Sequence, residues 1–229
     1  MRKKVIIVYH GIGTEDPFMQ VDVQEFQKQV SYLQSVFRIV HVRELLTVES
    51  QEPMATIMFD DAFLSAFGAM QFLDGLQIAY DVALIEEYIG MKEYCSLEQL
   101  KQLKKACFVF HTKSHQVLAG LQEKELEMQI SSEYIDQLLP CEKGILVYPR
   151  GIYDEHTKRL LYQKNYIAGL TALPFHVSKR SNLYEIPRIC INGYLSLQKF
   201  RFLLSIWGNL YLHLAFVKRR LLGQDYLGK

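Results

Sequence analysis

Two short segments carry side chains that can bind a metal ion and move a proton. Asp60 and Asp61 are adjacent, and His111 and His115 are four residues apart. On a helical turn, that spacing would put both imidazoles on one face. One carboxylate and two neutral imidazoles can hold a divalent ion and leave positions open for water and substrate. We therefore predict a metal site formed by Asp61, His111 and His115.

The ligand types favour zinc, while cobalt, nickel, manganese and iron stay open. A bound ion lowers the pKa of its water toward ~7, so a neighbouring carboxylate can act as general base. Asp60 fits that role because an apolar run precedes both acids and predicts that they end a strand. The alternatives are chance surface histidines with a solvated acidic turn, or an iron site of two histidines and one carboxylate.

Short apolar runs alternate with amphipathic stretches along the chain. Asp22 and Ser96 begin capping-box patterns, Asp154 is a third capping residue, and apolar residues recur every four positions from Leu126 to Leu138, which predicts helices. Strand–helix alternation predicts parallel strands, and hence an α/β fold in the form of a closed or nearly closed barrel. The seven predicted strands are rich in β-branched and aromatic residues and lie at 5–9, 56–59, 78–84, 107–110, 145–148, 166–170 and 188–191.

In such barrels the chemistry gathers at the carboxyl ends of the strands. His10 follows the first predicted strand, and Asp60 and Asp61 follow the second. His111 follows the fourth, and Arg150 follows the fifth. We therefore expect the reactive side chains to meet at one rim of the barrel.

Three segments resemble family motifs: Met58-Phe59-Asp60-Asp61-Ala62, His111-Thr112-Lys113-Ser114-His115 and Tyr148-Pro149-Arg150-Gly151. They are similar to the Thr-Phe-Asp-Asp-Gly, His-Ser/Thr-x-x-His and third motifs of the polysaccharide deacetylases, the NodB-homology group of carbohydrate esterases. The third segment resembles the exopolysaccharide branch, as does the opening Val8-Tyr9-His10-Gly11. Order and spacing agree over residues 4–172, roughly three-quarters of the chain.

The resemblance implies a distorted (β/α) barrel with about seven parallel strands and metal-dependent removal of acetyl groups from N-acetylhexosamine. The substrate would be a saccharide or its lipid- or nucleotide-linked precursor. By the same resemblance Asp60 is the base, and Asp61, His111 and His115 hold the metal. The resemblance also implies that Tyr148, Pro149, Arg150 and Gly151 form the segment that binds substrate and oxyanion.

The chain departs from the family pattern around the two acids. Met58 and Ala62 replace the usual Thr and Gly, and Val147 stands where many members carry an Arg that orients the base. Arg188 is our candidate to replace that arginine, and we place it among the residues around the substrate.

The general acid is the least defined part of the predicted site. We find no clear Leu-x-His motif that would supply it. His176, just past the sixth predicted strand, and His10, at the predicted rim, are both candidates, and the sequence does not choose between them. His213 fits the motif poorly, and we expect it to pack in a helix.

Length and composition fit one globular domain over residues 1–229. The chain is 49% apolar and 22% charged with a formal net charge of +1, so we expect no nucleic-acid partner. Four cysteines without a CxxC pair predict buried, reduced thiols. The amino-terminal apolar run is shorter than the ~7–15 residues of a signal peptide, so we expect a cytoplasmic location.

Residues 196–229 form a helical, apolar and basic segment in this prediction. An apolar and aromatic run from Phe202 to Val217 is followed by Lys218-Arg219-Arg220. Helices that close the barrel are one interpretation. The other is an interfacial segment that touches the inner face of a membrane. The oligomeric state is not determined by the sequence.

Three kinds of function fit these residues. The first is a metal-dependent N-deacetylase of sugars, with O-acetyl ester hydrolysis open to the same machinery. The second is a metal- and carbohydrate-binding protein without turnover, which the altered first motif and the missing acid favour. The third is a hydrolase of another amide, such as a cyclic imide. Asp60 favours an enzyme, because binding alone needs no base.

Overall fold

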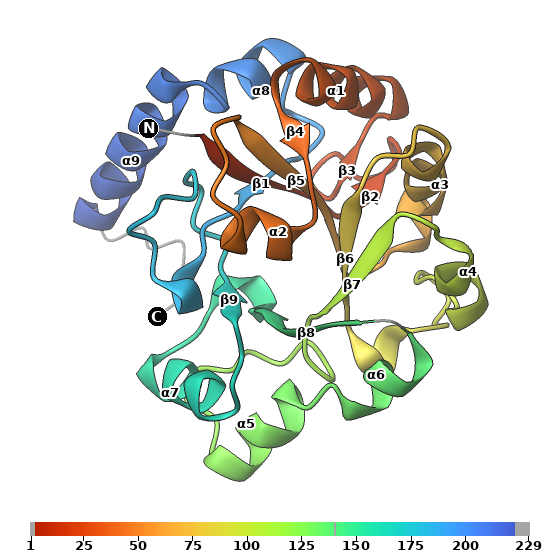
Figure 1. Cartoon of the computed structure of the whole chain (residues 1–229), viewed down its shortest axis with the longest axis vertical. Coiled ribbons are helices and arrows are strands. Elements are labelled where there is room, and N and C mark those ends of the chain that lie inside the picture. Colours follow the sequence, from red (N-terminus) through yellow and green to blue (C-terminus); the bar gives the residue numbers. More distant parts are fainter. Residues whose placement is uncertain (1–2, 140, 223–229) are drawn as a thin grey trace.

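Parallel strands form a curled sheet at the centre of the fold, with helices packed around it (Figure 1). The computed structural model describes residues 3–139 and 141–222, and only the backbone of residues 141–143. Seven strands follow one another in the order β10-β1-β5-β6-β7-β8-β9, and every neighbouring pair is parallel. The predicted α/β fold with a curled, barrel-like parallel sheet is confirmed.

All seven predicted strands are present, with ends that differ by a few residues. They are β1 (Lys4–Tyr9), β5 (Met54–Asp60), β6 (Tyr80–Leu84), β7 (Ala106–Phe110), β8 (Cys141–Val147), β9 (Ala168–Leu170) and β10 (Ile189–Cys190). Three strands of two residues each were not predicted, because so short a segment shows no periodicity. Of these, β2 (Gly11–Ile12) pairs with β3 (Gln20–Val21), and β4 (Arg38–Ile39) pairs with β5.

The helices begin where the capping residues predict. The side chains of Asp22, Ser96 and Asp154 each accept a hydrogen bond from a backbone N–H of the following turn. The α-helices are α1 (Val23–Val36), α2 (Val42–Thr47), α3 (Phe67–Gly75), α4 (Leu97–Gln102), α5 (Glu123–Ile130), α6 (Glu133–Leu138), α7 (Glu155–Gln163), α8 (Leu197–Leu203) and α9 (Ile206–Leu221). Short 3₁₀ turns are η1 (Leu64–Ala66), η2 (Glu86–Tyr88), η3 (Pro149–Gly151) and η4 (Leu183–Glu185).

The single helix predicted from Leu126 to Leu138 is wrong. The chain is extended at Ser131, and this divides the segment into α5 and α6. Tyr134 is 58% exposed, and Ile135 is the buried residue of α6. Adjacent serines compete for backbone hydrogen bonds and weaken a helix interior, so the four-residue repeat was interrupted.

The inner side of the curled sheet is filled by alternate strand side chains and by α2. Val42 and Leu45 of α2 pack against this inner cluster. Asp81 also points inward, is fully buried, and accepts a hydrogen bond from the Val42 N–H at 2.9 Å. Asp81 therefore does not weaken β6, because its carboxylate stabilises the amino end of α2.

The segment between β9 and β10 brings the two edges of the sheet together. Leu170 pairs with Ile186 in a parallel bridge, and the Thr171 N–H donates to the Ile186 carbonyl at 2.8 Å. The Ile191 N–H then donates to the carbonyl of Val8 in β1. The carboxyl ends of the strands consequently face one rim.

Gly169 of β9 is expected to tolerate no side chain. A Cβ there would overlap the hydroxyl of Tyr148, which is itself fully buried. We expect Gly169→Ala to lower the free energy of unfolding by about 1–3 kcal/mol through overpacking. Urea unfolding measures this change. Gly68→Ala is the matched control, because its Cβ would lie in open space within α3, and an equal loss there would contradict the overpacking account.

Candidate metal centre

Strand β5 carries both acids to the rim. Asp60 is its last residue, and Asp61 and Ala62 follow with φ angles of 69° and 56°. A non-glycine residue in this left-handed region costs roughly 1–2 kcal/mol. Ala62 stands where the family motif has Gly, which adopts this conformation without that cost. The sharp turn lets consecutive acids point to different partners.

A loop after β7 holds the two histidines. Thr112 and His115 both have positive φ angles, 69° and 60°. The Oγ1 of Thr112 accepts a hydrogen bond from the His115 N–H at 3.0 Å. This folds the loop back until the rings of His111 and His115 lie 4.7 Å apart between centroids. The expected helical turn is therefore wrong, because left-handed residues bring the imidazoles together.

The three predicted metal ligands converge. The Nε2 atoms of His111 and His115 lie 3.3 and 3.8 Å from Oδ1 of Asp61. That oxygen is buried and has no well-formed hydrogen bond among the described residues. The Nδ1 of His111 lies 2.9 Å from the Val147 carbonyl, so a neutral ring donates there and turns its Nε2 lone pair toward Asp61. This donor set fits a divalent cation.

The electrostatics favour metal binding at neutral pH. Burial, followed by the charge of His111, lowers the pKa of His115 to about 4, so its lone pair is available. Burial acts to lower the pKa of His111, but Asp61 and Asp60 outweigh it and raise that pKa. Burial acts to raise the pKa of Asp61, but the neighbouring histidines outweigh it and lower that pKa. A cation would compete with the proton of His111.

Arg188 fixes Asp60 from the segment just before β10. Its Nη1 lies 2.8 and 3.0 Å from the two oxygens of Asp60, and its Nε donates to the Thr171 carbonyl at 2.8 Å. Both charged residues are 2% exposed. Burial acts to raise the pKa of Asp60, but the charge of Arg188 leads the effects that hold it below its usual value. Asp60 is therefore an oriented anion, and Arg188 orients it instead of lining the substrate side.

The segment from Tyr148 to Gly151 divides into supporting and exposed residues. Tyr148 is buried, donates its hydroxyl to the Tyr184 carbonyl at 2.9 Å and stacks on Tyr153, so it does not face a substrate. Pro149 and Gly151 are buried in the same turn. Arg150 is exposed, its charge contributes to the low pKa of His115, and its backbone N–H has no acceptor among the described residues.

His10 lies at the predicted rim. After the effect of burial, its charge is among those that lower the pKa of both Asp60 and Asp61. Its side chain is partly exposed. The structure therefore brings His10 to the two acids, where it remains a candidate for the general acid.

His176 lies at the opposite end of the sheet. The neighbouring Val177 N–H donates to the carbonyl of Lys4, where β1 begins, about 16 Å from the rim at ~3.3 Å per residue. The Nε2 of His176 lies 2.9 Å from the Leu203 carbonyl of α8. The chain runs back toward the amino ends after the short β9, so His176 is not a candidate for the acid.

An aromatic cluster beside the acids was not predicted. The rings of Phe63 and Tyr94 stack at 5.0 Å, and Tyr88 lies 4.9 Å from Tyr94. The Cys95 N–H donates to the Ala62 carbonyl, which holds this loop against the turn after β5. Burial and then the charge of Asp61 raise the pKa of Tyr94. No sequence pattern links residues so far apart.

Gln129 of α5 supports the histidine loop. Its carbonyl accepts from the Lys113 N–H, and its side chain accepts from the Ser114 N–H and donates to the Ser114 hydroxyl at 2.8 Å. Gln129 is 3% exposed. The sequence signal for this role was a polar residue, Gln129, directly beside the apolar positions of a predicted helix.

A second group of metal-binding side chains lies on the inner face of the sheet. Ligand atoms of His41, Asp81 and Cys107 lie within 4.8 Å of one another. Cys95 is buried and Cys107 is partly buried. Cys190 is exposed, so the prediction of uniformly buried thiols is wrong, while the side chain of Cys141 lies outside the described residues.

The fold is that of the polysaccharide deacetylases of NodB-homology type. No profile of a known protein family matches the chain. The chain is 25% identical over 205 residues to the Bacillus subtilis protein named "Putative polysaccharide deacetylase YxkH", covering 85% of this chain and 73% of that protein.

Solved structures show the same architecture. The Streptococcus pyogenes deacetylase PplD in complex with acetate has a TM-score of 0.79 at 21% identity, covering 89% of this chain and 98% of that chain. IcaB from Ammonifex degensii has a TM-score of 0.75 at 18% identity, with 91% and 98% covered. The resemblance to the polysaccharide deacetylases is confirmed.

The ion pair predicts a specific defect in Arg188→Met. We expect the free energy of unfolding at neutral pH to fall by about 3–5 kcal/mol, because a carboxylate is left buried without its partner. In the wild type, Asp60 has a lower pKa in the folded state than in the unfolded state. The resulting stability is fully present at pH values above the unfolded-state pKa and is lost as the pH falls through the folded-state pKa. In the variant, the pKa of Asp60 in the folded state rises above its pKa in the unfolded state. The variant should therefore lose stability as the pH rises past the unfolded-state pKa.

Urea unfolding in the presence of a chelator, at about pH 4 and about pH 7, measures both effects. Arg159→Met is the matched control, because Arg159 is exposed on α7 and its loss should change stability by about 0.5 kcal/mol or less. Similar small losses in the two variants would contradict a structural role for the buried pair.

Proposed function

We propose that this chain is a metal-dependent hydrolase that removes the N-acetyl group from an N-acetylhexosamine in a saccharide or its lipid- or nucleotide-linked precursor. The observation that carries the proposal is an oriented base beside a cation site. Asp60 is held ionised by Arg188, and the next residue, Asp61, belongs to the ligand set. A site that only binds a metal has no use for a second, buried carboxylate with its own counter-charge.

Each group at the rim has a role in amide hydrolysis. When bound by Asp61, His111 and His115, a divalent ion, most naturally zinc, supplies a Lewis acid and a water of lowered pKa. Asp60 accepts the proton of the attacking water. The backbone N–H of Arg150 donates a hydrogen bond to the oxyanion of the tetrahedral species. His10 donates a proton to the departing nitrogen.

The aromatic cluster gives the saccharide a surface to bind. Phe63, Tyr88 and Tyr94 lie beside the turn that carries Asp61, and all three are partly exposed. Aromatic rings offer an apolar face, and tyrosine adds a polar edge, which suits a sugar with C–H and hydroxyl faces. We propose this cluster as the platform for the acetylated hexosamine.

Two of the similar proteins are named deacetylases, and one of them was solved with acetate. Acetate is the product that deacetylation would release, which supports the same reaction for this chain. O-acetyl esters would pass through a similar tetrahedral species, so they are the second candidate substrate. The cytoplasmic location and the choice of zinc stay predictions.

Metal content is the first test of the site. We expect about one equivalent of metal after reconstitution with zinc, because one three-ligand set meets at the rim. Asp61→Ala and His115→Ala should lose it, as measured by elemental analysis. His41→Ala is the matched control, since it changes the second group and should leave the rim site loaded. A wild-type protein that binds no metal would contradict the proposal.

Turnover depends on Asp60 in a way that metal binding does not. Asp60→Asn should keep the metal and lower kcat on a chitooligosaccharide by about 10²–10⁴-fold, because it removes the general base. Glu87→Gln is the control, an exposed acid close to the histidine loop. A metal-loaded wild type that binds saccharide and hydrolyses neither amide nor ester would favour the binding protein instead.

A further inference from the structure

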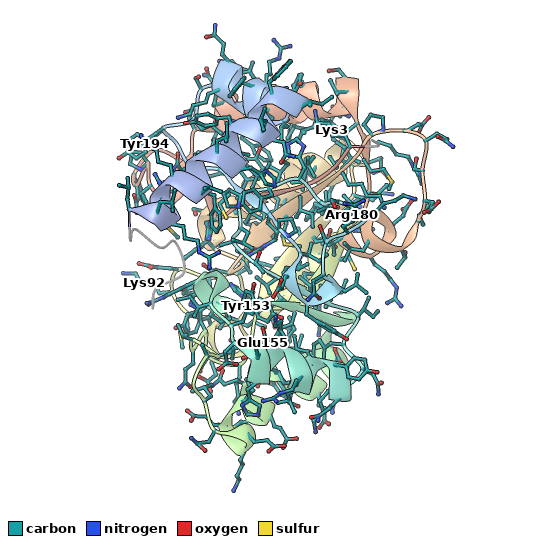
Figure 2. The ribbon with its side chains drawn as sticks, turned by 90° about the vertical axis from the view of Figure 1, so that its left-hand side faces the viewer. Lys3, Lys92, Tyr153, Glu155, Arg180 and Tyr194 are labelled. Carbon is teal, nitrogen blue, oxygen red and sulfur yellow. The ribbon has the colours of Figure 1, made fainter. Side chains whose placement is uncertain are left out.

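Helix α9 carries its apolar stripe on the outside of the molecule. Figure 2 faces the side on which α9 lies, and the helix crosses the front of that view. Spacings of three and four residues place five large apolar side chains along one face of the helix. They are Trp207, Leu210, Leu214, Val217 and Leu221, with exposed fractions of 72%, 50%, 62%, 53% and 82%.

The opposite side of α9 is fixed to the rest of the protein. Gly208 packs so closely that a Cβ would overlap the Phe202 carbonyl. The side chain of Asn209 accepts a hydrogen bond from the His176 N–H at 3.0 Å. The ring of His213 stacks on the ring of Phe175 at 4.1 Å between centroids, and the ring of Phe216 also contacts that of Phe175. These contacts hold the helix in an orientation in which the stripe faces outward.

The charge of this segment has one sign. Residues 196–222 contain five Lys or Arg residues and no Asp or Glu. Lys218, Arg219 and Arg220 form the last turn of α9 and are exposed. A face that combines a solvent-facing apolar stripe with a basic end is complementary to an anionic surface that also has an apolar interior.

We propose that α9 docks the chain onto an anionic lipid surface. The stripe would lie along the boundary between headgroups and acyl chains, and the basic last turn would contact the headgroups. Trp207 and Tyr211 are residue types enriched at this depth. A second copy of the chain is a poorer occupant, because its α9 would bring the like charges of Lys218, Arg219 and Arg220, and no acidic residue, to the same helix.

The geometry favours a helix lying along the surface. In the described part of the chain, no single helix is long and apolar enough to cross a membrane. The α8 and α9 helices pass that test only as a pair, and they meet at a bend of 84°. Docking would hold the chain on a surface that can carry saccharides attached to lipids, and this last step rests on the proposed function.

Trp207 is the only tryptophan in the chain, so its fluorescence reports on the stripe directly. We expect a blue shift and quenching by brominated acyl chains with vesicles of phosphatidylcholine and phosphatidylglycerol. Vesicles of phosphatidylcholine alone should bind far less. Lys218→Gln with Arg220→Gln should lower partitioning roughly 25-fold, about fivefold per charge. Leu210→Gln with Leu214→Gln should lower it at least about tenfold.

The matched control is Met128→Gln with Tyr162→Gln, two exposed apolar residues on α5 and α7 whose loss should leave partitioning unchanged. Circular dichroism and thermal unfolding show whether each variant is folded. Absence of vesicle binding by the folded wild type overturns the proposal. A lipid-free dimer that the Leu210 and Leu214 changes dissociate also overturns it and assigns the stripe to a second copy. Because the readout is binding, neither result decides whether the chain hydrolyses acetyl groups.

Discussion

The buried ion pair between Arg188 and Asp60 is the interaction on which the site depends. A carboxylate that is 2% exposed loses its hydration and stays ionised only beside a charge that replaces it. Arg188 also holds the Thr171 carbonyl, so one guanidinium joins β5 to the segment that closes the sheet. Closure of the sheet and the charge of the base are therefore one structural requirement.

Backbone strain is concentrated at the same rim. Five of the seven non-glycine residues with positive φ in the described chain are Asp61, Ala62, Thr112, His115 and Arg150. Such conformations persist only where surrounding contacts determine them. Here the contacts come from Gln129, which supports the histidine loop, from the Thr112 hydroxyl within that loop, and from the Cys95 N–H on the Ala62 carbonyl. The ligand set is consequently held by residues that bind no metal themselves.

The sequence predicts the strands and the rim because both follow from local rules. Buried parallel strands are short apolar runs, and the residues after them meet at one edge. His176 was expected at the rim because it follows β9 in the sequence. After the three residues of β9, however, the chain turns back toward the amino ends of the strands, and no local sequence pattern indicates that turn. The aromatic partner Tyr94 was missed for a related reason: its contact with Phe63 joins segments about thirty residues apart. Arg188 could be proposed as the partner of Asp60 only because Val147 occupies the position where many family members carry the arginine that orients the base.

The two interpretations of the carboxyl-terminal segment show what burial adds to periodicity. A stripe of large apolar residues on a helix ordinarily marks the side that packs against a core. In α9 the inward side holds Gly208, Asn209 and Leu212, and the stripe of larger apolar residues is outside. Periodicity alone predicts that the stripe exists, but it does not predict whether the stripe faces the core or the solvent. The close packing of Gly208 on Phe202 and the hydrogen bond from the backbone N–H of His176 to Asn209 add that direction, so contacts remote from the chemistry determine which face of α9 the protein exposes.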